Sequence, residues 1–218
     1  MIVHFRNNQK IIKEKLYQLK SLPKGTKTDE YSGIINQGAT CYLNSFIQSI
    51  FHIPLLTQMI FDVEPREGNQ PIAALKILFS VLARKEQGVT TKELTESFGW
   101  DSLDVVTQQD VHDFATFFFT LMKESFPADD FNSLFRSEIG SFFYPGDGTK
   151  ILLEKKTTMD FQVPFAGFRN LQDSINNIFK NEIYGKDGQN GMIGKEIIKF
   201  PPILFFHLNR YNSTKIIL

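Results

Sequence analysis

The chain has 218 residues, 42% of them hydrophobic and 22 of them phenylalanine, which is enough for one large domain or two small ones. Its 24 basic and 24 acidic side chains balance, so no electrostatic argument favours a nucleic-acid or anionic-membrane partner. The single cysteine excludes an internal disulfide, and no apolar run approaches the roughly 18 residues of a membrane span. The N-terminus lacks the apolar core of a signal peptide, so we expect an intracellular protein of the cytoplasm, the nucleus or both.

Helices are predicted through the first 127 residues. Residues 8–21 form a basic amphipathic segment, which a proline-glycine break and a polar linker separate from Tyr31. Thr90 and Glu93 fit a capping box, and Thr107 with Asp110 at its third helical position marks another helix start. Apolar spacing near 3.6 residues predicts helices over the following ranges: 40–52, 55–61, 72–82, 90–98 and 107–121.

After Pro127 the pattern changes to strands. Segments 134–144 and 150–156 flank a Pro-Gly-Asp-Gly turn, which predicts a β-hairpin. The remaining expected elements are a strand at 159–164, a short helix at 171–179, a glycine-punctuated mobile loop at 185–194 and a strand at 203–211. Helices followed by strands indicate an α+β fold.

The lone cysteine is the strongest candidate for chemistry. Cys41 opens a predicted helix behind Gly38, with Thr40 as the expected N-cap. The unpaired N–H groups and partial positive charge of a helix start favour the nucleophilic thiolate. Asn36 stands five residues upstream, where its amide could turn toward the sulfur and stabilise an oxyanion. Taken alone, a single cysteine is more often a small buried core residue, and at this point that alternative stays open.

Three motifs together resemble the ubiquitin-specific proteases, a family of cysteine peptidases. Residues 36–45, Asn-Gln-Gly-Ala-Thr-Cys-Tyr-Leu-Asn-Ser, resemble the family's cysteine box. Residues 108–114 resemble its Gln-Gln-Asp segment, and residues 200–211 resemble its Leu-Pro-Pro strand. The motifs occur in family order. Residues 97–101, Ser-Phe-Gly-Trp-Asp, are most similar to the herpesvirus-associated subfamily.

The resemblance implies a papain-like cysteine protease shaped like a hand. Residues 1–30 would be an N-terminal basic helix and linker, and residues 31–218 a partial catalytic domain. Within that domain, 31–127 would form the helical thumb, 128–199 the fingers and 200–218 the start of an incomplete palm. The family carries its general-base histidine downstream of the third motif. We therefore expect only the N-terminal part of a catalytic domain, inactive by itself.

None of the histidines is a convincing replacement for that base. His4 precedes the matched region, and His52 lies at the far end of the Cys41 helix. His112 stands where the family commonly has glutamine, and His207 takes an ordinary strand position. A nucleophilic cysteine needs a base within hydrogen-bond reach. The general base is thus expected outside residues 1–218.

The resemblance also implies which residues hold the substrate. Ubiquitin ends in Leu-Arg-Leu-Arg-Gly-Gly, and the carboxylates of Asp110 and Asp113, three residues apart on one helix, suit its two arginines. Asp113 replaces the family's glutamate. Without the motif, Asp110 could equally be a helix cap, and the two roles are compatible. Trp100 lies in a segment that, in the subfamily, rearranges when ubiquitin binds. If the segment moves here, Gly99 is its expected pivot; a buried core tryptophan is the alternative.

The expected function is that of a deubiquitinating thiol isopeptidase acting on ubiquitin and ubiquitinated proteins, without a cofactor. Many relatives bind zinc through paired Cys-x-x-Cys knuckles, which a chain with one cysteine cannot form. One rival is a non-catalytic ubiquitin-binding or decoy module. Another is a protease for a ubiquitin-like modifier.

Overall fold

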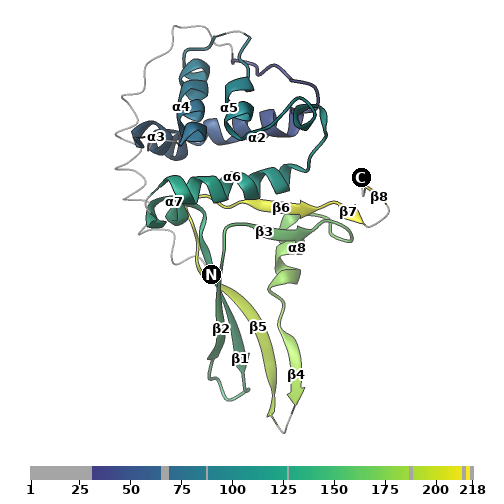
Figure 1. Ribbon diagram of the computed structural model, residues 1–218. Coiled ribbons are helices and arrows are strands. Elements are labelled where there is room, and N and C mark those ends of the chain that lie inside the picture. Colours follow the sequence, from purple (N-terminus) through teal and green to yellow (C-terminus); the bar gives the residue numbers. More distant parts are fainter. Residues whose placement is uncertain are drawn as a thin grey trace. The chain divides into compact units, whose positions relative to one another are not determined.

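The computed structural model describes residues 31–64, 69–86, 88–126, 128–186, 189–212 and 215–216 (Figure 1). The chain divides into two compact units, one ending at Ala128 and the other beginning at Asp129. The predicted basic helix at 8–21 and its linker lie outside the described residues. Within the described ranges, no helix combines the length and the apolar character needed to cross a membrane.

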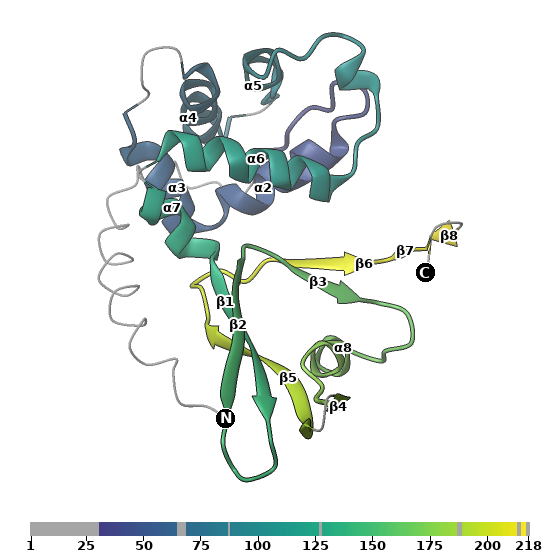
Figure 2. The ribbon, with the colours of Figure 1, turned by 60° about the horizontal axis from the view of Figure 1, so that its bottom comes forward.

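The first unit is built from helices. Its elements are α2 (Cys41–Phe51), α3 (Pro54–Asp62), α4 (Gln70–Ala83), α5 (Lys92–Ser97), the 3-10 turn η2 (Asp104–Val106) and α6 (Val111–Ser125). α2 and α6 lie side by side in both views (Figures 1 and 2), and aromatic rings fill the seam between them. The ring of Phe46 stands edge-on to those of Phe114 and Phe118, with centroids 5.4 and 5.2 Å apart. The predicted helices are confirmed, because each buries its apolar stripe.

Two predicted helix starts are wrong in detail. The N-cap of α5 is Thr91 and not Thr90, whose hydroxyl only accepts from the Lys92 N–H at 3.2 Å. α6 begins at Val111, so Asp110 is its N-cap and not a residue inside the first turn. Thr107 starts no helix: it is the C-cap of η2, and its hydroxyl donates to the Leu103 carbonyl at 2.7 Å. In both places neighbouring hydroxyl or carboxylate groups compete for the cap.

The second unit is mainly a sheet. Its elements are α7 (Ala128–Phe135), β1 (Ser137–Tyr144), β2 (Ile151–Thr158), β3 (Phe161–Pro164), α8 (Leu171–Ile178), β4 (Glu182–Lys186), β5 (Gln189–Lys199), β6 (Phe206–Asn209), β7 (Tyr211–Asn212) and β8 (Lys215–Ile216). Four strands form an antiparallel sheet in the order β2-β1-β5-β4, and β3 pairs in parallel with β6 (Figure 2). The predicted hairpin is β1–β2. Helices followed by strands confirm the α+β class.

Two expectations for this unit are wrong. The strand expected from residue 134 starts at Ser137, and the residues before it form α7, whose Phe131, Leu134 and Phe135 are buried at helical spacing. The expected mobile loop at 185–194 is instead the β4–β5 hairpin. A Cβ on Gly191 would collide with the Tyr144 carbonyl oxygen and the Phe143 ring. Glycine there permits close strand packing.

Candidate active site

A short turn delivers the chain to the start of α2. Before it, the Ile35 N–H donates to the Val89 carbonyl at 2.8 Å, which anchors the incoming segment. The Asn36 side-chain oxygen then accepts from the Gly38 N–H, the Thr40 N–H and the Thr40 hydroxyl, at 3.0 to 3.1 Å. These three bonds close the turn before α2. Thr40 is the N-cap residue, as predicted, although no side chain of the described residues makes a capping hydrogen bond to the helix start.

The 3-10 turn η2 packs against the same segment. The Ala39 N–H donates to the Val105 carbonyl at 2.9 Å. Gly38 has φ +142°, and a Cβ there would come within 2.9 Å of a Val106 methyl group. Only glycine therefore lets the backbone take this conformation and approach η2 so closely. The close neighbour of Gly38 is thus the protein's own η2 turn.

Cys41 is the first residue of α2, and its side chain is exposed. The alternative of a buried core cysteine is therefore wrong. The next residues of the helix explain why: Tyr42, Leu43 and Phe46 take its buried face and leave Cys41 on the opposite side. A thiol at an open helix start, with unpaired backbone N–H groups beside it, is accessible to a substrate carbonyl.

A glutamine that the sequence analysis assigned no role reaches the thiol. The Gln108 side-chain nitrogen donates to the Cys41 sulfur at 3.8 Å. Asn36 does not make the expected contact with the sulfur among the hydrogen bonds of the described residues, because its oxygen is committed to the turn. The signal for Gln108 was present, since it is the first residue of the Gln-Gln-Asp motif, but nothing local connects it to a residue 67 positions earlier.

The two candidate substrate-binding carboxylates lie at the exposed start of α6. The Asp110 carboxylate caps the helix by accepting from the His112 N–H at 2.7 Å, as the cap alternative required. Asp113 lies in the first turn. Both side chains are exposed, so both are accessible to a ligand. They do not share a helical face in the expected sense, because Asp110 has extended backbone angles.

Trp100 packs at the edge of the first unit's aromatic core. Its ring lies edge-on to Phe98 and Phe114, with centroids 5.4 and 6.1 Å away, and it is half-buried. Gly99 has φ +77°, which turns the chain after α5. The Trp100 N–H then donates to the Thr95 carbonyl at 3.2 Å. Gly99 is thus a turn residue, its role as a pivot stays a prediction, and the Trp100 ring contacts two rings of the core.

Tyr42 and Asp104 are ionisable neighbours of Cys41 within the first unit. Burial raises the pKa of Tyr42 above its ordinary value, and the nearby Asp104 carboxylate and Cys41 thiolate raise it further. Tyr42 therefore stays neutral beside the thiol and supplies no general base near neutral pH. His52 is the C-cap of α2, at the opposite end of the helix from Cys41. This position agrees with the expectation from the sequence that His52 is not the base.

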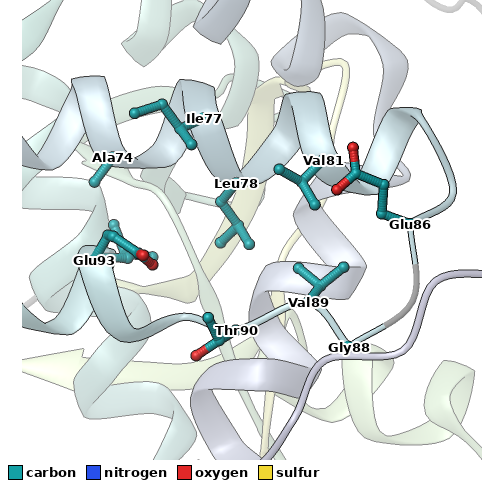
Figure 3. A pocket seen from close by; sticks show the side chains of 10 residues that line it. Ala74, Ile77, Leu78, Val81, Glu86, Gly88, Val89, Thr90 and Glu93 are labelled. Carbon is teal, nitrogen blue, oxygen red and sulfur yellow. The ribbon is translucent and has the colours of Figure 1, made fainter.

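A cavity of about 170 Å³ lies between α4 and α5 of this unit (Figure 3). Its walls are mostly aliphatic: Ala74, Ile77, Leu78, Val81, Val89 and Leu94. Glu86 and Glu93 are its only charged lining groups, and Glu86 is paired with Arg84. The described lining residues include no thiol and no histidine or lysine beside the Thr90 hydroxyl, so Cys41 remains the candidate nucleophile.

Comparison with known proteins identifies the family. The family model for ubiquitin carboxyl-terminal hydrolase matches residues 32–217. The chain belongs to this family. It is 30% identical over 200 residues to ubiquitin carboxyl-terminal hydrolase 5 of Schizosaccharomyces pombe, covering 83% of this chain and 18% of that protein. It is 30% identical over 205 residues to ubiquitin carboxyl-terminal hydrolase 15 of Saccharomyces cerevisiae, covering 85% and 16%. Ubiquitin C-terminal hydrolase 13 of Arabidopsis thaliana is 29% identical over 202 residues, covering 85% and 18%.

The match confirms the family that the three motifs indicated, because residues 32–217 include all of them. The chain spans less than a fifth of the length of these three ubiquitin carboxyl-terminal hydrolases. Membership of the hydrolase family therefore concerns this segment, and the roles of Cys41, Asn36, Asp110, Asp113 and Trp100 remain predictions.

Proposed function

We propose that the protein is a deubiquitinating thiol isopeptidase that cleaves after the C-terminal Gly-Gly of ubiquitin, and that this chain is the N-terminal part of its catalytic domain. The observation that carries the proposal is the exposed thiol of Cys41 at the start of α2, with an amide donor 3.8 Å from its sulfur. Within the family, the sequence at 97–101 favours the herpesvirus-associated subfamily. In the hand-like arrangement, residues 31–127 would be the thumb.

The chemistry follows from the groups around the thiol. A histidine outside residues 1–218 removes the Cys41 proton, and the thiolate attacks the carbonyl of the last ubiquitin glycine. The carbonyl electron pair moves to oxygen, where the Cys41 N–H and the amide nitrogen of Asn36 stabilise the oxyanion. Collapse breaks the bond to the substrate amine, which leaves with the proton. Water then hydrolyses the thioester, releases ubiquitin and restores Cys41.

Gln108 adds a donor to this arrangement. Its side-chain nitrogen already points at the sulfur in the free protein. An N–H directed at the sulfur can orient the nucleophile through a weak hydrogen bond. Gln108 and the helix start would then act together on Cys41, while Asn36 keeps the turn closed through its oxygen and offers its nitrogen to the substrate.

The first test is covalent labelling of the full-length gene product. Ubiquitin carrying a C-terminal electrophile is expected to form one adduct, located at Cys41 by peptide mapping, because the probe places an electrophilic carbon where the substrate carbonyl would lie. The same electrophile without ubiquitin is the control and should label far more slowly. A folded protein that forms no adduct, or forms one at another residue, would contradict the proposal.

A second test separates the two roles of Asp110. Asp110→Asn keeps an oxygen for the cap, since asparagine and aspartate cap about equally well, but removes the charge offered to an arginine of the ubiquitin tail. A charge-assisted hydrogen bond contributes about 1.5–3 kcal/mol, so KM should rise by roughly 10- to 100-fold with little change in thermal stability. The measurement is kcat and KM on ubiquitin with a fluorogenic C-terminal amide.

Asp110→Ala and Asp113→Asn are the companion variants. The alanine loses cap and charge together, and should also lower the melting temperature. Asp113→Asn should raise KM alone, because the Asp113 carboxylate is not the cap of α6. An unchanged KM in both asparagine variants would mean that these carboxylates do not bind the tail. Running a ubiquitin-like modifier beside ubiquitin tests the third interpretation, since a tail without arginines should be insensitive to either change.

A further inference from the structure

A partly buried network of polar side chains supports the turn that precedes Cys41. The Gln37 side-chain nitrogen donates to the hydroxyls of Thr91 at 2.9 Å and Thr95 at 3.3 Å, at the start of α5. Both threonines are only 1% exposed. The Thr91 hydroxyl in turn donates to the Asn44 side-chain oxygen at 3.4 Å on α2. The network thus joins the turn, α5 and α2.

The same network holds the backbone on both sides of the turn. The Asn44 side-chain nitrogen donates to the Ile34 and Ile35 carbonyls at 3.4 and 3.2 Å, at the entry to the turn. The Gln37 backbone N–H donates to the Thr40 hydroxyl at 3.1 Å, and that hydroxyl donates to the Asn36 side-chain oxygen. Gln37 is therefore bonded at its side chain to α5 and at its backbone to the group that orients Asn36.

The cost of breaking these hydrogen bonds favours one position of the Gln37 side chain. The Thr91 and Thr95 hydroxyls are buried, and a buried hydroxyl without a partner carries a desolvation cost, which favours the position of Gln37 that bonds them. The partners stand 54 and 58 residues away along the chain, so the turn is fixed by α5 and not by its own sequence alone. Networks of this kind are strongly coupled, because each bond polarises and orients the next.

We propose that Gln37, Thr91 and Thr95 are positioning residues that set the geometry of Asn36 and Cys41 for attack on the substrate carbonyl. The inference rests on the proposed thiol isopeptidase activity. None of the three needs to touch the substrate. A shift of Gln37 would move Asn36 through the Thr40 hydroxyl, and a displacement of about 1 Å at a reacting centre can lower a rate by about 10²-fold.

The test replaces the hydroxyl without changing the shape of the side chain. In the full-length gene product, Thr95→Val should lower kcat on ubiquitin with a fluorogenic C-terminal amide by roughly tenfold and leave KM nearly unchanged, because the geometry and not the binding surface is altered. Thr95→Ser restores the hydroxyl and should restore most of kcat. Gln37→Met removes the amide at similar length and should act in the same direction.

Thr57→Val is the matched control for the loss of a buried threonine hydroxyl. Thr57 is 3% exposed on α3, and its hydroxyl donates to the Phe51 carbonyl at 2.6 Å, outside the network. It should lower the melting temperature about as much as Thr95→Val but leave kcat unchanged. Equal kcat in Thr95→Val and wild type, or an equal loss of kcat in Thr57→Val, would overturn the proposal.

Two further measurements keep the network testable whatever the first variants do. If Thr95→Val does not fold, Gln37→Met carries the same test from the other partner. The double variant Gln37→Met/Thr95→Val should lose no more kcat than the worse single variant, because the partners belong to one coupled unit. Additive losses would contradict that coupling.

Amide hydrogen exchange over residues 34–40 should be faster in Thr95→Val than in Thr57→Val. If the wild type fails to label with the ubiquitin electrophile, the proposed function fails, while this exchange comparison still decides the network.

Discussion

Replacing Cys41 with alanine in the full-length gene product is expected to abolish cleavage of ubiquitin conjugates while leaving ubiquitin binding intact. Removing a hydrolase nucleophile lowers kcat on the order of 10⁶-fold. No other residue of the chain can take over as a thiol nucleophile, because Cys41 is its only cysteine. The side chain is small and exposed, so its loss disturbs no packing. Initial rates on a fluorogenic ubiquitin amide and calorimetric titration with ubiquitin measure the two effects separately.

The same experiment decides between catalysis and a decoy. Ser49→Ala is the matched control, since Ser49 lies exposed on the same helix and bonds only the Ser45 carbonyl at 2.8 Å. It should turn over at the wild-type rate. Turnover that persists in Cys41→Ala would place the nucleophile elsewhere. A wild-type protein that binds ubiquitin, shows no turnover and binds equally well as Cys41→Ala would support the non-catalytic module instead.

The helices of the first unit could be predicted because their periodic residues are the ones buried. In α2 the apolar residues Leu43, Ile47 and Ile50 recur at helical spacing, and each side chain is at most 4% exposed. Burial of such a stripe is what stabilises a surface helix, so periodicity and structure report the same physical cause. The helix starts were less predictable, because several hydroxyls and carboxylates compete for each cap and packing decides among them.

The second unit shows where local patterns fail. Glycines at 185, 191 and 194 suggested a mobile loop, yet the structure places them in the β4–β5 hairpin. A Cβ on Gly194 would displace the exposed side chain of Asn181, a neighbour that no local pattern indicates. The turn signal between β1 and β2 was reliable because its conformational demands are local.

The candidate site divides in the same way. Cys41 and the turn that ends in Thr40 could be recognised, because helix start, glycine and nucleophile are adjacent in the sequence. Gln108 and the threonines of α5 could not be connected to them, since hydrogen bonds spanning 54 to 67 residues leave no local trace. The groups that hold a nucleophile in place are therefore the part of a site that only the folded chain brings together.

The seam between α2 and α6 should be the most sensitive point for stability. Phe118 is fully buried, and its ring lies edge-on to Phe46 on α2 with centroids 5.2 Å apart. Phe118→Ala is expected to lower the free energy of unfolding by about 3–5 kcal/mol, which combines lost burial with a cavity. Guanidinium titration followed by the fluorescence of Trp100, the only tryptophan of the chain, measures this directly.

Phe117→Ala is the matched control on the neighbouring position of α6. Phe117 is 42% exposed. Among the described residues its ring contacts those of Phe98 and Phe114, with centroids 5.1 and 6.2 Å away. Its loss should be about 1 kcal/mol, typical of a substitution outside the core. Equal shifts of the unfolding midpoint in the two variants would mean that the α2–α6 seam does not dominate the stability of the first unit. A larger shift for Phe118→Ala would show that the contact between α2, which begins with Cys41, and α6, which follows Gln108, stabilises the first unit.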